Sequence, residues 1–120
     1  MKKKILIVED EKNIILGVKT CLEFAAYDVN VVEDGSKVLQ TAIAYKPDLI
    51  LLDLMLPGLH GYDVCRQLKS ETQTKHIPVV VLTAKTEQKD RDEAIKAGAD
   101  SFMTKPFRPE ELWQKINKFL

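Results

Sequence analysis

Short runs of aliphatic residues recur along this chain, and each is followed by a longer amphipathic segment. Three of the runs, residues 5–8, 49–52 and 79–82, contain only Ile, Leu and Val. Continuous apolar runs of this length are typical of parallel strands that are covered by helices on both faces of a sheet. The alternation of the two kinds of segment therefore predicts repeated strand–helix units and an α/β fold.

Five such units fit the pattern. We expect strands over Lys4–Val8, Asp28–Val32, Leu49–Asp53, Val79–Thr83 and Ser101–Met103, with the second strand near an edge. We expect helices over Lys12–Phe24, Ser36–Tyr45, Tyr62–Ser70, Gln88–Ala97 and Pro109–Phe119. Gly98 suits the C-terminal cap of the fourth helix, and Pro109 suits the first turn of the fifth. Gly17 lies inside the first helical pattern, where glycine costs about 1 kcal/mol relative to alanine.

Length and composition limit the classes of function. The 120 residues, 45% of them hydrophobic, are the size of one ordinary domain, so we expect residues 1–120 to fold as a unit. Eighteen basic residues balance eighteen acidic ones, which argues against direct binding to nucleic acid or to an anionic membrane. Cys21 and Cys65 have no partners at metal-ligand spacing, and we interpret them as buried thiols in a reducing cytoplasm. No apolar stretch approaches the ~20 residues of a membrane span.

Acidic, hydroxyl and ammonium side chains lie at the end of, or just after, four of the five predicted strands. They are Glu9 and Asp10 after the first strand, Asp53 at the end of the third, Thr83 at the end of the fourth, and Lys105 just after the fifth. In an open parallel sheet, ligands bind outside the carboxyl ends of the strands. We therefore expect these five side chains to converge on one edge of the sheet, with the carboxyl oxygen of Asp53 facing solvent.

The three carboxylates of this set predict a metal site. Brought together, Glu9, Asp10 and Asp53 would repel one another by about 4 kcal/mol per pair at about 4 Å. Oxygen ligands in small number favour Mg²⁺, with Mn²⁺ as a possible substitute, whereas Zn²⁺ would need His or Cys. Metal, ammonium and hydroxyl together suit a phosphoryl group, and Asp53 is the best placed acceptor. Any one of these acids alone could equally be a capping or loop-end residue.

Four short motifs, in this order, resemble the response regulator receiver domain of two-component signalling. They are Ile-Val-Glu-Asp-Glu at residues 7–11, Leu-Leu-Asp-Leu-Met-Leu-Pro-Gly at 51–58, Leu-Thr-Ala at 82–84 and Lys-Pro-Phe at 105–107. The resemblance covers the whole chain. It implies a doubly wound parallel sheet of five strands in the flavodoxin-like order 2-1-3-4-5, with five helices on both faces.

The resemblance also implies roles for the site residues. Asp53 would accept a phosphoryl group from the phosphohistidine of a sensor histidine kinase or phosphotransfer protein. Asp10, Asp53 and the backbone carbonyl of Met55 would hold Mg²⁺, and Glu9 would act mainly through a metal-bound water. Such a domain catalyses only its own phosphorylation and dephosphorylation, and is not a metabolic enzyme.

Two further groups complete the phosphate site that the resemblance implies. The Thr83 hydroxyl would bind a phosphoryl oxygen, and the Lys105 ammonium would contact Asp53 or its phosphate. A cis peptide bond before Pro106 is implied as well. Met55 and Lys85 would lie at the mouth of the pocket, where related domains tune the lifetime of the phosphate, although a loop Met and a solvated Lys are equally ordinary.

Output in the family depends on a switch. Thr83 would move toward the phosphate, and Phe102 would swing into the space that it leaves, which changes the surface of the fourth helix, last strand and last helix. Phe102 lacks the hydroxyl of the Tyr often found there, and a core-filling Phe is the alternative. A phosphorylation-dependent homodimer is possible through the same surface, with Arg91 and Asp100 as candidate opposite charges.

Two other functions have to be weighed against phosphoryl acceptance. A pseudo-receiver, which is never phosphorylated, would act only as a protein-interaction module. A phosphatase related to the haloacid dehalogenases would want a second Asp two residues after the nucleophile, and Met55 occupies that place. The stimulus, the cognate kinase and the output domain or target protein are not specified by this sequence.

Overall fold

The computed structural model of the chain describes residues 2–54, 60–84 and 88–120, apart from the side chain of Asp90. Five strands form one parallel sheet: β1 (Lys4–Val8), β2 (Asp28–Val32), β3 (Leu49–Asp53), β4 (Val79–Thr83) and β5 (Ser101–Thr104). Their order is β2-β1-β3-β4-β5, as the resemblance implied. Four strands have the predicted bounds, and β5 is one residue longer than predicted.

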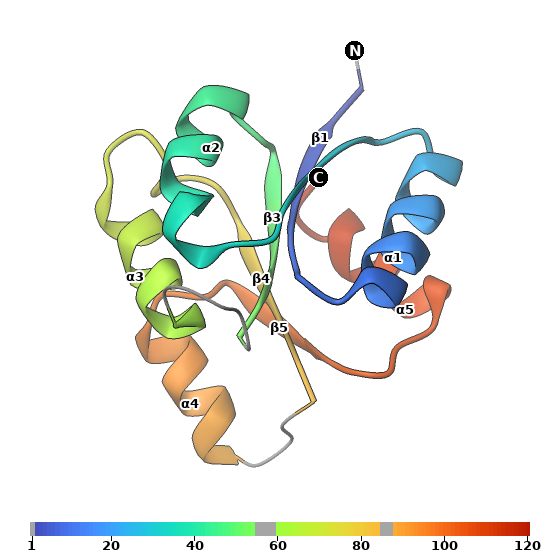
Figure 1. Cartoon of the computed structure of the whole chain (residues 1–120). Coiled ribbons are helices and arrows are strands. Elements are labelled where there is room, and N and C mark those ends of the chain that lie inside the picture. The colour runs from blue at the N-terminus through green and yellow to red at the C-terminus, as the bar shows by residue number, and fades with distance from the viewer. Residues whose placement is uncertain (1, 55–59, 85–87) are drawn as a thin grey trace.

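Helices cover both faces of the sheet. They are α1 (Lys12–Phe24), α2 (Val38–Tyr45), α3 (Gly61–Ser70), α4 (Gln88–Lys96) and α5 (Pro109–Asn117). Figure 1 shows α1 and α5 on one face, and α2, α3 and α4 on the other. The predicted α/β fold is therefore confirmed. Among the described residues, no helix has the length and apolar composition needed to cross a membrane.

The first predicted helix has the observed bounds, and each of the other four differs from the observed helix by one or two residues at one end. The second helix also differs in kind. Its first turn is a separate 3-10 turn, η1 (Gly35–Lys37). The Asp34 carboxylate accepts a hydrogen bond from the Ser36 backbone N–H at 2.9 Å, which holds this tighter turn ahead of α2. Gly98 follows α4 with φ of 99°, the left-handed conformation expected of a C-terminal glycine cap.

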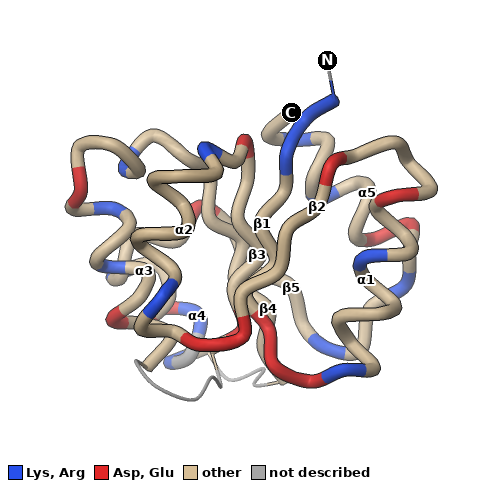
Figure 2. The backbone as a smooth tube through the Cα atoms, turned by 45° about the horizontal axis from the view of Figure 1, so that its top comes forward, with Lys and Arg blue, Asp and Glu red and all other residues tan. Residues whose placement is uncertain are grey.

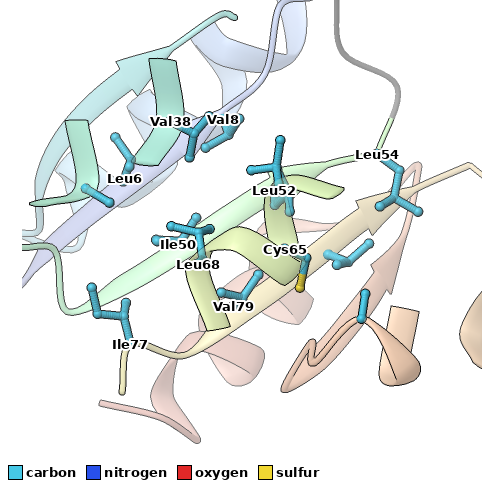
Figure 3. Close-up of a cluster of buried hydrophobic side chains, with 14 of the residues drawn as sticks. Leu6, Val8, Val38, Ile50, Leu52, Leu54, Cys65, Leu68, Ile77 and Val79 are labelled. Atoms are coloured by element: carbon cyan, nitrogen blue, oxygen red, sulfur yellow. The ribbon is translucent and has the colours of Figure 1, made fainter. Parts of the chain in front are cut away.

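The core consists of two layers separated by the sheet. Alternate side chains of the central strands point to opposite faces, so each apolar run supplies both layers. One layer packs against α2, α3 and α4, and Figure 3 shows part of it; its strand residues include Leu6, Val8, Ile50, Leu52, Val79 and Val81. The other layer packs against α1 and α5; its strand residues include Ile5, Ile7, Leu49, Leu51, Val80 and Leu82.

Burial separates central strands from edge strands in the predicted way. Every residue of β3 and β4 is buried, whereas β2 alternates between exposed and half-buried residues until Val32. The central strands are thus fixed on both faces, and their carboxyl ends are held at one edge of the sheet. In Figure 2, acidic segments lie where the chain leaves β1 and β2.

Both cysteines are free thiols, and only one is fully buried. Cys65 lies inside the layer under α3, where burial raises its pKa to about 11. Cys21 is half-buried rather than buried, and its carbonyl oxygen accepts a hydrogen bond from Trp113 Nε1 at 3.2 Å. A raised thiol pKa makes Cys65 a packing residue rather than a reactive one.

Gly17→Ala is expected to raise the free energy of unfolding by about 0.5–1 kcal/mol, the cost of a glycine in a helix interior. A Cβ at this position has no heavy atom within 4 Å outside its own helix, so nothing offsets the gain. Urea unfolding measures the difference. Gly98→Ala is the opposite control, because its φ is positive and a Cβ would lie 2.8 Å from Lys69 Cγ. A Gly17→Ala protein less stable than wild type would contradict the expected gain.

Candidate functional site

The ends of β1 and β3 bring three carboxylates together. Val8 pairs with Leu52 in the sheet register, so the residues that come next, Glu9 and Asp53, lie at the same level of the sheet. One oxygen from each of Glu9, Asp10 and Asp53 lies within 4.8 Å of the others. The predicted convergence of the three acids is therefore present in the structure.

The ammonium of Lys105 lies among these acids. Its Nζ is 3.0 Å from Glu9 Oε2 and 3.4 Å from Asp53 Oδ2. The Lys105 backbone N–H donates to the Thr83 carbonyl oxygen at 2.8 Å, which fixes the residue after β5 to the end of β4. The peptide bond between Lys105 and Pro106 is cis, as the resemblance implied.

The burial of the cluster differs from the sequence-based expectation at one point. We expected the Asp53 carboxyl oxygen to face solvent, whereas only 5% of its side chain is exposed. Glu9 is fully buried, and Asp10 is exposed. Asp53 is thus covered by its neighbours, and Asp10 forms the solvent side of the cluster. Lys105 is nearer to Glu9 than to Asp53, consistent with the larger need of a fully buried carboxylate for a counter-charge.

Glu9 has a strongly perturbed acidity. Burial raises the pKa of Glu9 from 4.5 to about 7, because it removes water from the carboxylate. The hydrogen bond from Lys105 opposes this shift, and the charge of Asp53 adds to it. Near neutral pH, the metal-free site therefore holds a proton on Glu9 for much of the time.

The composition of the cluster fits a hard divalent cation. When all are ionised, three negative carboxylates and one positive ammonium leave two negative charges. The ligand atoms available from Glu9, Asp10 and Asp53 are all carboxylate oxygens, and the exposure of Asp10 leaves one side of the cluster open to water. Mg²⁺ prefers oxygen ligands and keeps several waters, so this donor set suits it.

The fold and the cluster match one protein family. A family model described as the response regulator receiver domain matches residues 5–117. The chain belongs to this family. It is 44% identical over 120 residues to the alkaline phosphatase synthesis transcriptional regulatory protein PhoP of Bacillus subtilis, and the match covers all of this chain and 49% of that protein.

Other relatives agree with this assignment. The receiver domain is 40% identical to the DNA-binding response regulator MtrA of Mycolicibacterium smegmatis, over 97% of this chain and 50% of that protein. It therefore spans about half the length of these two regulators. Chemotaxis protein CheY4 of Vibrio cholerae has a TM-score of 0.94 and 29% identity, with both chains covered completely.

One solved structure also contains a metal. The receiver domain of the sensor histidine kinase PA1611 of Pseudomonas aeruginosa PAO1, which has magnesium coordinated in its active-site cleft, has a TM-score of 0.92. It is 30% identical, and the match covers 99% of this chain and 98% of that one. That structure and the acidic cluster both agree with magnesium binding by this family.

The predicted switch residues lie on neighbouring strands of the receiver domain. Thr83 is the last residue of β4, is 3% exposed, and pairs with Thr104 of β5 in the sheet register. Phe102 is half-buried, and the Arg91 guanidinium lies over its ring at 4.7 Å from the centroid. The sequence suggested Arg91 only as a charge for a dimer and gave no sign of this contact.

Asp100, the other charge suggested for a dimer, is engaged inside the receiver domain. Its Oδ2 lies 2.7 Å from Lys69 Nζ and accepts a hydrogen bond from the Val79 backbone N–H at 2.8 Å. Lys69 Nζ also donates to the Ile77 carbonyl oxygen at 2.7 Å. These contacts tie the end of α3 to the starts of β4 and β5.

Two of the predicted site residues fall outside the described part of the chain, and a third residue has an unexpected role. The two are Met55, predicted as a metal ligand and tuning residue, and Lys85, predicted as a tuning residue. His60, to which the sequence assigned no chemistry, caps α3: its Nδ1 accepts a hydrogen bond from the Tyr62 backbone N–H at 3.2 Å. His is an unusual cap, so composition gave no signal for it.

In the presence of a chelator, the free energy of unfolding should fall as pH rises from about 5 to about 8. The raised pKa of Glu9 means that the folded state holds more protons than the unfolded state between its ordinary value of 4.5 and about 7. Stability is therefore lost across this window, by an amount on the order of 2 kcal/mol. Urea unfolding at several pH values, compared between wild type and Glu9→Gln, measures the Glu9 contribution. The same pH slope in both proteins would show that the Glu9 pKa is not raised.

Proposed function

We propose that the receiver domain accepts a phosphoryl group on Asp53 from a sensor histidine kinase or a phosphotransfer protein. The observation that carries the proposal is the position of the Asp53 carboxylate, within 4.8 Å of Glu9 and Asp10 and 3.4 Å from the Lys105 ammonium. The same arrangement would allow a small phosphoryl donor such as phosphoramidate to react. The domain would then be a signalling module, here taken as residues 1–120, which catalyses only its own phosphorylation and dephosphorylation.

In this reaction, an Asp53 carboxylate oxygen attacks the phosphorus of the phosphohistidine. The new O–P bond forms as the P–N bond breaks, and the imidazole leaves with the electron pair of that bond. Transfer of this kind spreads charge over the three phosphoryl oxygens, so positioning and charge neutralisation supply most of the catalysis. The Lys105 ammonium would help to neutralise this charge, because its Nζ already lies close to both Glu9 and Asp53.

The proposal includes Mg²⁺, which would offset the negative charge of the carboxylates and of the transferring group. Asp10, Asp53 and the Met55 backbone carbonyl would hold it, and Glu9 would act mainly through a bound water. Thr83, buried at the end of β4, would donate its hydroxyl to a phosphoryl oxygen. Ala84, the next residue, is exposed and small.

Phosphorylation would change the surface formed by α4, β5 and α5. Thr83 and Phe102 are the proposed switch residues, and Arg91 stacks on the ring that would have to move. Loss of a cation–π contact of this kind costs about 0.5–1 kcal/mol at exposed sites, small enough for a switch to overcome. An output domain, a target protein or a second phosphorylated copy could read the changed surface. A cytoplasmic location is part of this proposal.

Wild-type domain incubated with phosphoramidate and Mg²⁺ should gain the mass of one phosphate, and Asp53→Asn should gain none. Intact-protein mass spectrometry makes the measurement. Asp63→Asn is the matched control, because Asp63 is an exposed acid of α3 that pairs with Arg66 at 2.9 Å. This control should be phosphorylated like wild type.

The pseudo-receiver alternative gives the opposite result. A wild-type domain that gains no phosphate from phosphoramidate or from a phosphorylated kinase would favour a module that acts only through protein contacts. Phosphate that persists in Asp53→Asn would instead place the acceptor elsewhere. We prefer phosphoryl acceptance because all three acids and Lys105 lie together at one edge of the sheet.

Lys85→Ala and Met55→Asn are each expected to change the rate at which the aspartyl phosphate hydrolyses. Side chains at the mouth of the pocket would control access of the attacking water, and a barrier change of about 1 kcal/mol alters a rate about fivefold. Loss of the phosphate mass with time, after removal of the donor, measures this rate. Hydrolysis rates equal to wild type in both variants would remove these two residues from the proposal.

A further inference from the structure

The first residue of α3 is in close contact with the residue that follows Asp53. Gly61 is buried, and its backbone N–H donates to the Leu54 carbonyl oxygen at 3.3 Å. A Cβ added to Gly61 would lie 2.5 Å from Leu54 Cα, 2.8 Å from its carbonyl oxygen and 3.0 Å from its carbonyl carbon. All three are backbone atoms, so no side-chain rotation could relieve the overlap.

Both sides of this contact are anchored. The Leu54 backbone N–H donates to the Leu82 carbonyl oxygen at 3.3 Å, which continues the pairing of β3 with β4. On the other side, α3 is held by fully buried side chains: Val64, Cys65 and Leu68. Figure 3 shows Leu54, Cys65 and Leu68 in the same core layer. Neither the strand end nor the helix can move away without disturbing this layer.

Leu54 is covalently joined to Asp53, so the placement of its backbone sets the placement of the carboxylate. That carboxylate lies 3.4 Å from Lys105 Nζ and within reach of Glu9 and Asp10 for a shared cation. Displacement by about 1 Å of a reacting group can reduce a rate by a large factor. We propose that Gly61 is a positioning residue for Asp53: the absence of a side chain lets α3 pack directly on the backbone of Leu54 and so holds the acceptor in the acidic cluster. The proposal rests on the function proposed above.

Two other glycines with described surroundings do not share this demand. A Cβ at Gly17 has no heavy atom within 4 Å outside its own helix. The three heavy atoms nearest to a Cβ at Gly98 would be side-chain atoms of Lys69 rather than backbone atoms. Of these three glycines, only Gly61 would press a side chain against backbone, and that backbone leads directly to the phosphoacceptor.

The test uses Gly61→Ala in the Gly17→Ala background, in which the more stable α1 offsets part of the cost of the added methyl group. Titration calorimetry measures the affinity for Mg²⁺, and mass spectrometry measures the rate of phosphorylation by phosphoramidate. We expect the affinity for Mg²⁺ to fall several-fold and the phosphorylation rate to fall about tenfold or more. Gly17→Ala alone should match wild type in both.

Leu22→Ala is the control for general destabilisation. Leu22 is fully buried in the core layer under α1, on the other face of the sheet from α3, so its truncation should lower the unfolding midpoint and leave Mg²⁺ affinity and phosphorylation rate as in wild type. Wild-type values in Gly61→Ala would overturn the proposal, as would equal losses in Leu22→Ala. Failure of Gly61→Ala to fold in the stabilised background would also overturn it, since the contact would then serve folding rather than positioning.

The outcomes also separate this inference from the proposed function. If the wild-type domain binds Mg²⁺ but accepts no phosphate, phosphoryl acceptance fails while the Mg²⁺ titrations still compare Gly61→Ala with its controls. If the wild-type domain is phosphorylated and Gly61→Ala behaves identically, only the role of Gly61 is lost.

Discussion

The structure depends on one electrostatic problem, which is the gathering of three carboxylates at a partly dehydrated edge of the sheet. Glu9 and Asp53 are buried, and their mutual repulsion would be unfavourable without a positive charge close by. Lys105 supplies one such charge, and a raised pKa relieves Glu9 of part of its own. The remaining negative charge would attract a divalent cation, either alone or together with a phosphoryl group. The apolar core keeps these groups together, because their strands cannot slide without exposing both layers.

Much of this arrangement could be predicted from the sequence. The strands were found because Ile, Leu and Val in unbroken runs have few alternatives to a buried parallel strand. The convergence of Glu9, Asp10 and Asp53 followed from the rule that parallel strands end at one edge. The strand order needed the resemblance to a known family, because no local pattern in residues 1–120 specifies which strands are neighbours.

Other features could not be predicted, because they depend on how much water the assembled neighbours exclude. The preference of Lys105 for Glu9 and the burial of Asp53 are of this kind. The stacking of Arg91 on Phe102 is another such feature. It joins α4 to β5, and no sequence pattern indicates that these two side chains are in contact. The cap formed by His60 was missed since its residue type rarely serves there. The roles given to Met55 and Lys85 stay predictions.

The hydrogen bond from the Lys105 backbone to the Thr83 carbonyl oxygen couples two parts of the site that have different tasks. One residue carries the hydroxyl of the proposed switch, and the other carries the cation that faces the acids. Because the bond joins main chain to main chain, a displacement of the end of β4 would pull the segment that follows β5 with it. In the proposed mechanism, the sensing of the phosphate and the neutralisation of its charge would therefore be mechanically linked rather than independent events.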